Sequence, residues 1–452
     1  MAMGLSARRF IALVVAMMLW GASARASMFD TYGFGARATA MGGAVVALSN
    51  DYEAVYYNPA NLLAYKRSHV GFGLNLVAPF VTIDRGGQDD SNDLKARQPP
   101  LNVTFNLGTA APLKGVFEEK VGFGIVLFHP LLAVTRIESV DPRFPYLYRY
   151  DQTPSKLLIG AALAVEPVDW LRLGIGLQLL AELEGRFDAA LSLTERRFTR
   201  EEIDAELLGT ISPTAGLSVG PFEGIRFGVA YRHELELRYA LPIKALVEEV
   251  GMLEVLIEGV TLYTPMQLAL GLSWDGHVGD GMTLAVELGV TWEHWSVAPP
   301  AGARFELTLD DSVLRAEENA AGREVQNILE AYRQPLQLEA VDTLTPRVGV
   351  EFRPTRDWVA RLGYFYRPTH LPEPRHEGNF LGTNAHGISL GAGYALADVT
   401  GVVQAPLQID LALQVTVLEN RVVRKADGYA PGGAYQFNGT ILNAALTVHH
   451  NF

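Results

Sequence analysis

The stretch IRFGVAYRHELELRYAL, residues 225–241, decides the fold class. Its odd positions carry aliphatic, aromatic and histidine side chains, whereas its even positions carry small or charged residues, five of them charged. A period of two places these two sets on opposite faces of a β-strand. Seventeen residues exceed the usual strand length of a soluble protein. The charged face is unsuited to a packed sandwich but suits a water-lined lumen.

The same alternation returns at 171–179, 284–292 and 409–417, where aliphatic residues alternate with polar or small ones. Residues of hydrophobic type make up 49% of the chain, yet outside the N-terminus no apolar run approaches the length of a membrane-spanning helix. Backbone groups in lipid must all be paired, so such strands have to close into a ring. The sequence therefore predicts an all-β fold, a transmembrane antiparallel β-barrel.

Connections between the expected strands alternate in length. Short turns are expected at 167–170, 220–223, 275–280 and 354–357, and they alternate with longer segments such as 134–155, 310–335 and 368–385. This is the pattern of periplasmic turns and external loops in outer-membrane barrels. We expect about fourteen strands, which places both termini in the periplasm: 69–84, 100–107, 121–133, 156–166, 171–195, 205–219, 224–244, 252–274, 281–309, 336–353, 358–367, 386–396, 407–422 and 436–452.

The N-terminus has the features of a secretory signal peptide. Arg8 and Arg9 precede an apolar run of eleven residues, and an A-x-A signal ends at Ala26. The alternative is an uncleaved anchor, but a helix needs roughly 20 residues to cross a bilayer. We therefore expect residues 1–26 to be removed.

The C-terminus is an alternating strand that ends in Phe452. Such an ending is typical of the signal that the barrel assembly machinery reads. The sequence thus predicts a protein of the bacterial outer membrane, with that machinery and membrane lipid as partners.

Composition argues against several classes of function. There are 37 Lys and Arg against 50 Asp and Glu, a net charge of -13, without a basic cluster for nucleic acid. The absence of cysteine removes disulfides, thiolate metal sites and cysteine nucleophiles. Two G-x-S-x-G matches, at 216–220 and 387–391, lie inside alternating strands and lack the sharp turn of a nucleophile elbow. We expect no enzyme activity, cofactor or metal, and no nucleic-acid partner.

One long external segment, 310–333, has apolar residues at helical spacing: Val325, Ile328, Leu329 and Tyr332. We expect a helix there whose apolar stripe packs against the barrel rim, with a ligand-binding role as the alternative.

A family resemblance lies between the signal peptide and the first strand. Residues 32–45 read YGFGARATAMGGAV, and residues 50–62 read NDYEAVYYNPANL. This block resembles the N-terminal region of the FadL/TodX-type transporters, in which a small-residue stretch is followed by an Asn-Pro-Ala motif. Weaker similarity covers much of the remaining chain, including 358–366 and the proline-rich loop at 367–374.

The resemblance implies a fourteen-stranded barrel, residues 68–452, plugged from within by an N-terminal hatch, residues 27–67. It also implies passive uptake of hydrophobic small molecules across the outer membrane. Long-chain fatty acids are the leading cargo, and aromatic hydrocarbons are an alternative. A secretion or assembly scaffold is the other role open to barrels of this kind.

Residues of this block are expected to be structural. Pro59 restricts its own φ and pushes Asn58 away from helical conformation, and the Asn58 amide can bond the barrel wall both as donor and as acceptor. Gly35, Arg37 and Ala60 complete the set that we expect to hold the hatch in place.

Family members are thought to release cargo sideways through a gap in the third strand. The matching residues here are Gly122, Gly124 and Pro130, because proline cannot donate to a ladder. The alternative is that Pro130 only begins an external loop.

Arginines on the charged face of 225–241 could bind a carboxylate. Arg226, Arg232 and Arg238 are therefore candidate contacts for a fatty-acid head group. The alternative is that they pair with Glu234, Glu236 and groups of the hatch, since buried charges require partners.

Overall fold

The computed structural model describes residues 31–84, 101–117, 119–131, 145–151, 157–192, 197–247, 251–279, 281–300, 304–310, 338–376, 378–396, 406–426 and 434–452. The expected signal peptide, residues 1–26, lies outside these ranges, as does all of the expected loop helix after Asp310.

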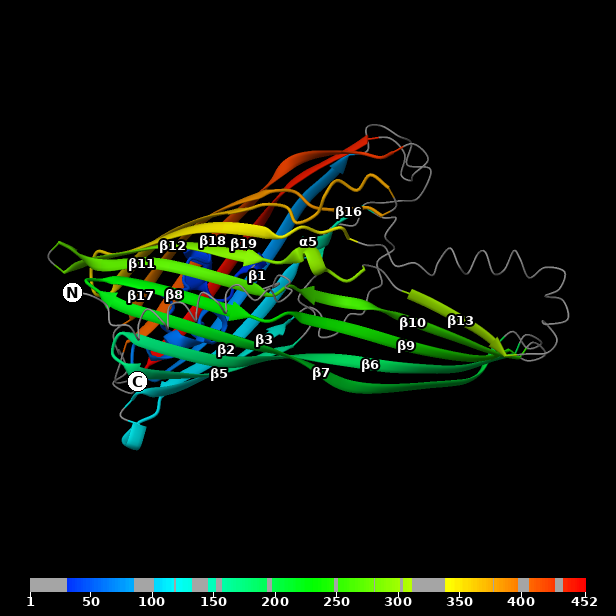
Figure 1. Ribbon diagram of the computed structural model, residues 1–452, viewed down its shortest axis with the longest axis horizontal. Helices are drawn as coiled ribbons and strands as arrows, with labels where there is room; N and C mark the ends of the chain where they lie inside the picture. Colours follow the sequence, from blue (N-terminus) through cyan, green and yellow to red (C-terminus); the bar gives the residue numbers. More distant parts are fainter. Residues whose placement is uncertain are drawn as a thin grey trace, which may run out of the picture.

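Fourteen antiparallel strands close into a barrel, which confirms the predicted fold class (Figure 1). Closure is made by β1 and β19, which pair from His69 and Asn451 to Asp84 and Gln436. In order around the ring the strands are β1 (His69–Asp84), β2 (Asn102–Pro112), β3 (Val121–Pro130), β5 (Leu158–Val168), β6 (Leu171–Ser192), β7 (Arg197–Phe222), β8 (Ile225–Arg232), β11 (Gln267–Gly279), β12 (Met282–Glu293), β14 (Thr343–Arg353), β15 (Trp358–Arg367), β17 (Ala385–Leu396), β18 (Leu407–Arg424) and β19 (Ala434–Asn451).

The connections alternate as expected. Tight turns join β5 to β6, β7 to β8, β11 to β12 and β14 to β15, all at the end where His69 pairs with Asn451. We call this the turn end, and the opposite end, which carries the longer connections, the loop end. An even number of strands therefore brings the start and the finish of the barrel to the same end.

Three of the expected strands are wrong as single strands. The expected strand 224–244 is divided at His233 and Glu234 into β8 and β9 (Leu235–Val247). In the same way 252–274 comprises β10 (Gly251–Thr264) and β11, and 281–309 comprises β12 and β13 (Arg304–Asp310). Alternation continues through each break, so the period of two did not mark where the chain leaves the barrel.

The additional strands form a sheet that projects from the loop end (Figure 1). There β9 pairs with β10, β10 pairs with β13, and β9 runs parallel to the far half of β6. The strands β6 and β7 are 22 and 26 residues long, and their far halves complete this sheet. We call β9, β10, β13 and the far halves of β6 and β7 the extension.

The outer face of the barrel is apolar, as lipid requires. Ile175 on β6 and Leu390 on β17 are 66% and 57% exposed, while their alternate neighbours face inward. Exposed aromatic side chains gather at the turn end, as in the interfacial belts of membrane proteins. They are Trp170, Phe222, Trp274, Trp358, Tyr394 and Phe452. No helix among the described residues is long and apolar enough to cross a membrane.

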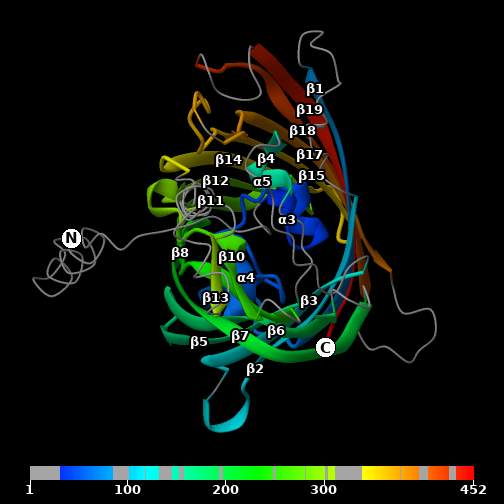
Figure 2. The same ribbon diagram turned by 90° about the vertical axis from the view of Figure 1, so that its right-hand side faces the viewer.

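The described residues that precede β1, residues 31–68, lie inside the ring of strands (Figure 2). We call residues 31–68 the N-terminal segment. It contains α3 (Ala36–Ala40), α4 (Ala54–Tyr57) and the 3-10 helix η1 (Pro59–Leu63), all of whose residues are buried. The remaining short elements are η2 (Gly115–Phe117), β4 (Tyr146–Leu147), α5 (Tyr148–Asp151), η3 (Trp295–Val297) and β16 (Phe380–Leu381).

Candidate functional site

One sector of the lumen wall is apolar, although the inward faces were expected to be polar and charged. It extends from β18 and β19 through β1 to β3, β5 and β6, and its buried side chains form one cluster. These side chains are Val77, Val126, Phe128, Leu158, Leu180, Leu418, Val423, Tyr435, Phe437 and Ile441. Strands of this sector thus present apolar residues to the lumen as well as to lipid.

The change from polar to apolar occurs along individual strands. On β19 the inward residues Thr447 and Asn443 lie toward the turn end, and Ile441 and Phe437 follow toward the loop end. On β18 the inward residue Leu418 similarly follows Thr416. The apolar sector therefore occupies the loop-end part of the lumen.

Aromatic residues of the N-terminal segment form the floor of this sector. The ring of Phe34 lies 6.3 Å from that of Phe128 on the wall, and 5.6 Å and 6.2 Å from those of Tyr56 and Tyr52. The Tyr57 hydroxyl accepts a hydrogen bond from the Phe34 amide at 3.0 Å. These contacts join the wall and the N-terminal segment in one apolar cluster.

Segments at the loop end cover the same cluster from the other side. The strands β4 and β16 pair with each other, and Leu147 and Leu381 within them are buried in the cluster. The Tyr32 hydroxyl donates to the Tyr150 carbonyl at 2.7 Å, which ties α5 directly to the N-terminal segment.

A second aromatic cluster lies beside the first at the loop end. His370 stacks on Trp295 with ring centroids 3.7 Å apart, and the Arg149 guanidinium lies 5.1 Å from the centre of the Trp295 ring. Arg149 also forms a buried ion pair with Glu293, 2.5 Å between nitrogen and oxygen. Burial, and then the charge of Arg149, holds the pKa of His370 well below its usual value. The cluster therefore favours the neutral form of the His370 ring.

The opposite sector of the wall, formed by β14, β15 and β18, holds the N-terminal segment through charge. The Glu351 carboxylate accepts from Arg37 at 2.9 Å, from Arg361 at 2.8 Å and from Arg353 at 2.8 Å. Arg361 also pairs with Asp410 at 2.5 Å. Because Glu351 and Arg361 are buried away from water, each charge in this network is stabilised by its oppositely charged partners.

The Asn-Pro-Ala motif lies against the wall of the barrel. The Asn58 amide donates to the carbonyls of Val46 and Leu217, and its oxygen accepts from the Ala60 amide. A side chain at Gly174 of β6 would overlap the Pro59 and Ala60 backbone, so glycine in the wall permits this close approach.

Gly35 and Arg37 lie at the start of α3. Gly35 has φ of +81°, and a Cβ there would overlap the carboxylate of Glu53. Arg37 bonds the Leu48 carbonyl and Asn50 in addition to Glu351. Both residues therefore hold the shape of the N-terminal segment.

The third strand, one of whose two readings was a lateral gap, is paired on both sides. Without a register shift, β3 pairs with β5 from Val121 to Phe128 and with β2 as far as Pro130, its last residue. Among described residues, Gly122 and Gly124 instead make room for side chains of η1 and α4, such as Leu63 and Val55. The pairing favours the reading in which Pro130 ends the strand.

The three candidate arginines are not brought together. Arg226 lies near the turn end and pairs with Asp275 at 3.3 Å. Arg232 donates to Gln267 and to the Tyr56 carbonyl, and its guanidinium lies 4.5 Å from the centre of the Tyr56 ring. Arg238 is on β9 in the extension, and its side chain lies outside the description. The three arginines lie apart because the expected strand is divided into β8 and β9.

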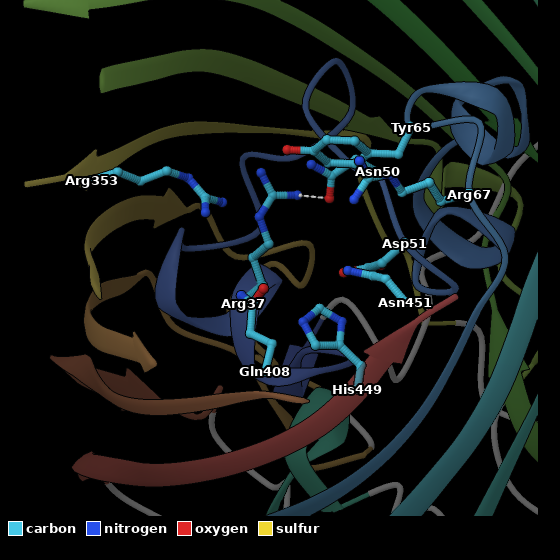
Figure 3. A pocket seen from close by; sticks show the side chains of 9 residues that line it. All are labelled: Arg37, Asn50, Asp51, Tyr65, Arg67, Arg353, Gln408, His449 and Asn451. Atoms are coloured by element: carbon cyan, nitrogen blue, oxygen red, sulfur yellow. Dashed lines mark hydrogen bonds between the residues drawn. The ribbon is translucent and has the colours of Figure 1, made fainter. Parts of the chain in front are cut away.

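A polar cavity of about 180 Å³ opens at the turn end, beneath the N-terminal segment (Figure 3). Arg37 reaches it from α3, Arg353 from β14 and His449 from β19. Its other lining residues are Asn50, Asp51, Tyr65, Arg67, Gln408 and Asn451. The cavity and the apolar cluster thus lie on opposite sides of the N-terminal segment.

Sequence reasoning did not find Glu351, Arg361 and Asp410, which bind or support the N-terminal segment. Nor did it find Glu287 of β12, whose carboxylate accepts from the Ala47 and Leu48 amides. The signal was present, because each is a charged residue at the inward position of an alternating strand. The alternation could not show which of these charged residues pair with one another or with the N-terminal segment. Among the described residues no group of three His, Asp or Glu side chains could hold a metal ion.

Solved structures with this architecture were found by comparison of folds. A Pseudomonas aeruginosa FadL homologue superposes with a TM-score of 0.56 at 13% identity, covering 95% of this chain and 99% of that one. The P. putida toluene transporter TodX gives 0.54 at 14% identity, covering 93% and 99%, and the CymD monoaromatic hydrocarbon channel gives 0.54 at 15%, covering 93% and 98%. No family model and no curated protein matches the sequence.

The fold therefore defines a class, the transmembrane β-barrels with a closed ring of fourteen strands. Within that class it is the FadL/TodX-type fold, as the N-terminal sequence block suggested.

Proposed function

We propose that this protein is an outer-membrane channel that takes up hydrophobic compounds passively, without a catalytic step. The observation that carries the proposal is the apolar sector inside the lumen. A general porin for polar solutes keeps a polar, water-filled lumen. Here a buried apolar cluster reaches from the loop end to Phe34 of the N-terminal segment.

The N-terminal segment acts as the hatch in this proposal. It separates the apolar sector from the polar cavity at the turn end. The ion pair of Arg37 with Glu351 and the backbone hydrogen bonds to Glu287 hold it against the wall. Cargo that has entered the apolar sector must therefore displace part of this segment, or leave between strands, to reach the periplasm.

Long-chain fatty acids are the cargo that we propose first, and neutral aromatic hydrocarbons are the alternative. The structural neighbours include a FadL homologue as well as transporters named for toluene and monoaromatic hydrocarbons. Arg232 lies beside the apolar ring of Tyr56, where a carboxylate could meet it, although it already bonds Gln267.

The test compares Phe128→Asn with Phe128→Leu, since Phe128 is buried in the apolar sector. Uptake of a radiolabelled long-chain fatty acid and of toluene is measured in cells whose own channels of this type are deleted. We expect Phe128→Asn to lower uptake about tenfold, because a buried amide without partners costs on the order of 1–3 kcal/mol. Uptake by Phe128→Leu should stay within about twofold of that by the unsubstituted protein, a difference below ~0.5 kcal/mol.

The heat-dependent gel mobility of the folded barrel shows whether each variant has assembled. Equal uptake by both folded variants, for both cargoes, would refute the proposal. A loss for only one cargo identifies the natural class.

A further inference from the structure

The polar cavity at the turn end, which we call the turn-end cavity, carries more positive than negative charge on its walls. Arg37, Arg67 and Arg353 line it, whereas Asp51 is the one carboxylate among its lining residues. Figure 3 shows Arg353 and Arg67 on opposite sides of Arg37. The excess of arginine is local, because the whole chain has a net charge of -13. The cavity therefore attracts anions in preference to cations.

A buried carboxylate positions two of these arginines. One oxygen of Glu351 accepts from Nε of Arg37 at 2.9 Å, and the other accepts from Nε and Nη2 of Arg353 at 3.2 Å and 2.8 Å. Arg361 bridges Glu351 and Asp410, at 2.8 Å and 2.5 Å. This network contains three positive and two negative groups, so one positive charge is uncompensated. Both guanidinium groups at the cavity are thus held in place before any ligand binds.

Each of these two guanidinium groups keeps a terminal nitrogen that the network does not use. Arg37 donates from Nη1 to the Leu48 carbonyl and to Asn50, and among the described residues its Nη2 has no hydrogen-bond partner. Arg353 uses Nε and Nη2 for Glu351, which leaves its Nη1. Because Arg37 is 5% exposed, an acceptor for its Nη2 has to lie inside the cavity. The uncompensated positive charge favours an anion over water as that acceptor.

His449 contributes a buried ring to the same cavity. Its side chain is 7% exposed and its Nε2 lies 3.4 Å from Oδ2 of Asp410, yet neither ring nitrogen has a hydrogen-bond partner in the described part of the chain. Figure 3 shows the ring beside the cavity, on the strand β19. A neutral imidazole has one N–H to donate, and buried donors are normally paired. An oxygen of an anion in the cavity supplies the acceptor that this ring lacks.

We propose that the turn-end cavity is a binding site for a carboxylate group, with Arg37 and Arg353 as its main contacts and Arg67 at its exposed edge. Guanidinium groups match the two oxygens of a carboxylate. Arg67 and Asp51 add charges of opposite sign, so a single negative charge neutralises the site. The volume of about 180 Å³ exceeds the roughly 10–15 Å³ that one water needs, and it accommodates the carboxylate with a short part of its chain.

The site lies on the far side of the N-terminal segment from the apolar sector. Its ligand is therefore either the head group of a fatty acid that has passed the segment or a small free carboxylate of the periplasm. Both sources share the chemistry that the arginines recognise. The inference thus goes beyond uptake, and it stands whether or not the channel carries fatty acids.

Chemical modification of arginine measures this binding in the purified full-length barrel. Phenylglyoxal reacts with guanidinium groups, and fragmentation of peptides in the mass spectrometer gives a separate rate for each arginine. Butyrate is the probe, and inorganic phosphate at equal ionic strength is the comparison anion. Arg356 is the internal control, because it is exposed in the turn between β14 and β15 and does not line the cavity.

We expect butyrate to protect the arginines of the cavity and not Arg356. At a concentration about four times its Kd, the free fraction of the site is about one fifth, so Arg67 and Arg353 should react about fivefold more slowly. Equal rates with and without butyrate overturn the proposal. Equal slowing at Arg356 does so too, as does stronger protection by phosphate than by butyrate.

Two variants and a matched control locate the contacts. Arg353→Gln should raise the Kd for butyrate about tenfold, because charge-assisted hydrogen bonds are the strong ones. Arg67→Gln changes an exposed residue that folding does not require, and it should raise the Kd about threefold, as expected of an exposed charge. Arg356→Gln should leave the Kd unchanged. Heat-dependent gel mobility confirms that each barrel is folded, and an unchanged Kd in both cavity variants overturns the proposal.

The length of the probe identifies the source of the carboxylate. A lower Kd for octanoate than for butyrate assigns the site to the head group of a fatty acid, whereas equal values assign it to a small free carboxylate. Either result requires the protection of Arg67 and Arg353 described above. Uptake by the Phe128 variants is measured separately, so failure of this site and failure of the proposed channel function are distinguishable.

Discussion

The two sides of the lumen wall differ although the outer face of the barrel is apolar throughout. On β14, β15 and β18 the inward side chains include Glu351, Arg361 and Asp410, which bind the N-terminal segment through a buried network of charges. On β19, β1, β3, β5 and β6 the inward side chains of the loop-end part are aliphatic or aromatic. The comparison teaches that one sector anchors the segment while the other provides an apolar surface beside it.

The largest effect is expected from Glu351→Gln, which breaks the charged sector. Three arginines, Arg37, Arg353 and Arg361, would lose their shared carboxylate. Removing one partner from a buried ion pair costs about 3–5 kcal/mol, because the remaining charges stay desolvated. Urea unfolding of the purified barrel, followed by tryptophan fluorescence, measures the change in free energy.

Glu419→Gln is the matched control. Glu419 pairs with His386, but both side chains are about 40% exposed, and an exposed pair contributes at most about 1 kcal/mol. Equal losses for the two variants would show that the network around Glu351 does not hold the segment.

Gly35→Ala tests how tightly the charged sector shapes the N-terminal segment. The substitution combines a positive φ with overlap of the Glu53 carboxylate, and we expect a loss of about 2–4 kcal/mol from strain and overpacking. Gly115→Ala has a similar φ of +79° but open space around its Cβ, so it isolates the backbone cost. The same urea titration applies, and a larger loss at Gly115 would contradict the assignment of the clash.

Two neighbours on one strand sharpen the comparison between the polar and apolar parts of the lumen. Leu418 and Thr416 both face inward on β18, but only Leu418 belongs to the apolar cluster. We expect Leu418→Asn to lower uptake of the hydrophobic cargo several-fold and Thr416→Asn to change it by less than about twofold, below ~0.5 kcal/mol. The measurement is the initial rate of uptake at equal amounts of folded barrel. A larger loss for Thr416→Asn than for Leu418→Asn would place the cargo path elsewhere.

The smallest effect concerns pH at the loop end. Burial holds the pKa of His370 below its ordinary value, so the folded cluster favours the neutral ring. Its stabilising contribution is complete above about pH 6.5 and decreases as the pH falls below that value. Arg149 and Arg367 oppose the charged form of His370, whereas Glu293 favours it.

Hydrogen exchange of the peptide that contains His370, corrected for intrinsic rates, should therefore be faster at pH 5 than at pH 7. His370→Phe keeps an aromatic ring against Trp295 but cannot titrate, and it should remove most of the difference. An unchanged pH dependence in His370→Phe would assign the effect to other groups.

Much of the barrel could be predicted from sequence because lipid imposes a simple rule. Every outward position between the aromatic belt and the loop end must be apolar, so Leu171 to Leu179 and Ile409 to Val417 show a period of two. The alternation of short turns with longer segments between these runs then indicated about fourteen strands. The closed ring of fourteen strands follows from both signals.

The same rule could not show where the barrel ends. The alternation of apolar and polar residues continues from β8 into β9, so residues 225–241 read as a single strand although β8 and β9 have different partners. For this reason Arg238 was expected in the lumen but lies on β9. Nor could alternation distinguish an inward Phe437 that lines an apolar path from an inward side chain that only packs.

By itself, then, the sequence determined which faces of the strands are apolar, how many strands close the ring, and that a glycine-rich block with an Asn-Pro-Ala motif precedes them. Only the tertiary structure decided that Arg37 meets Glu351 across 314 residues and that Phe34 meets Phe128. The physical reason is that local periodicity reports the solvent on each side of a strand. The partner of a buried charge or ring depends on which distant segments share the lumen.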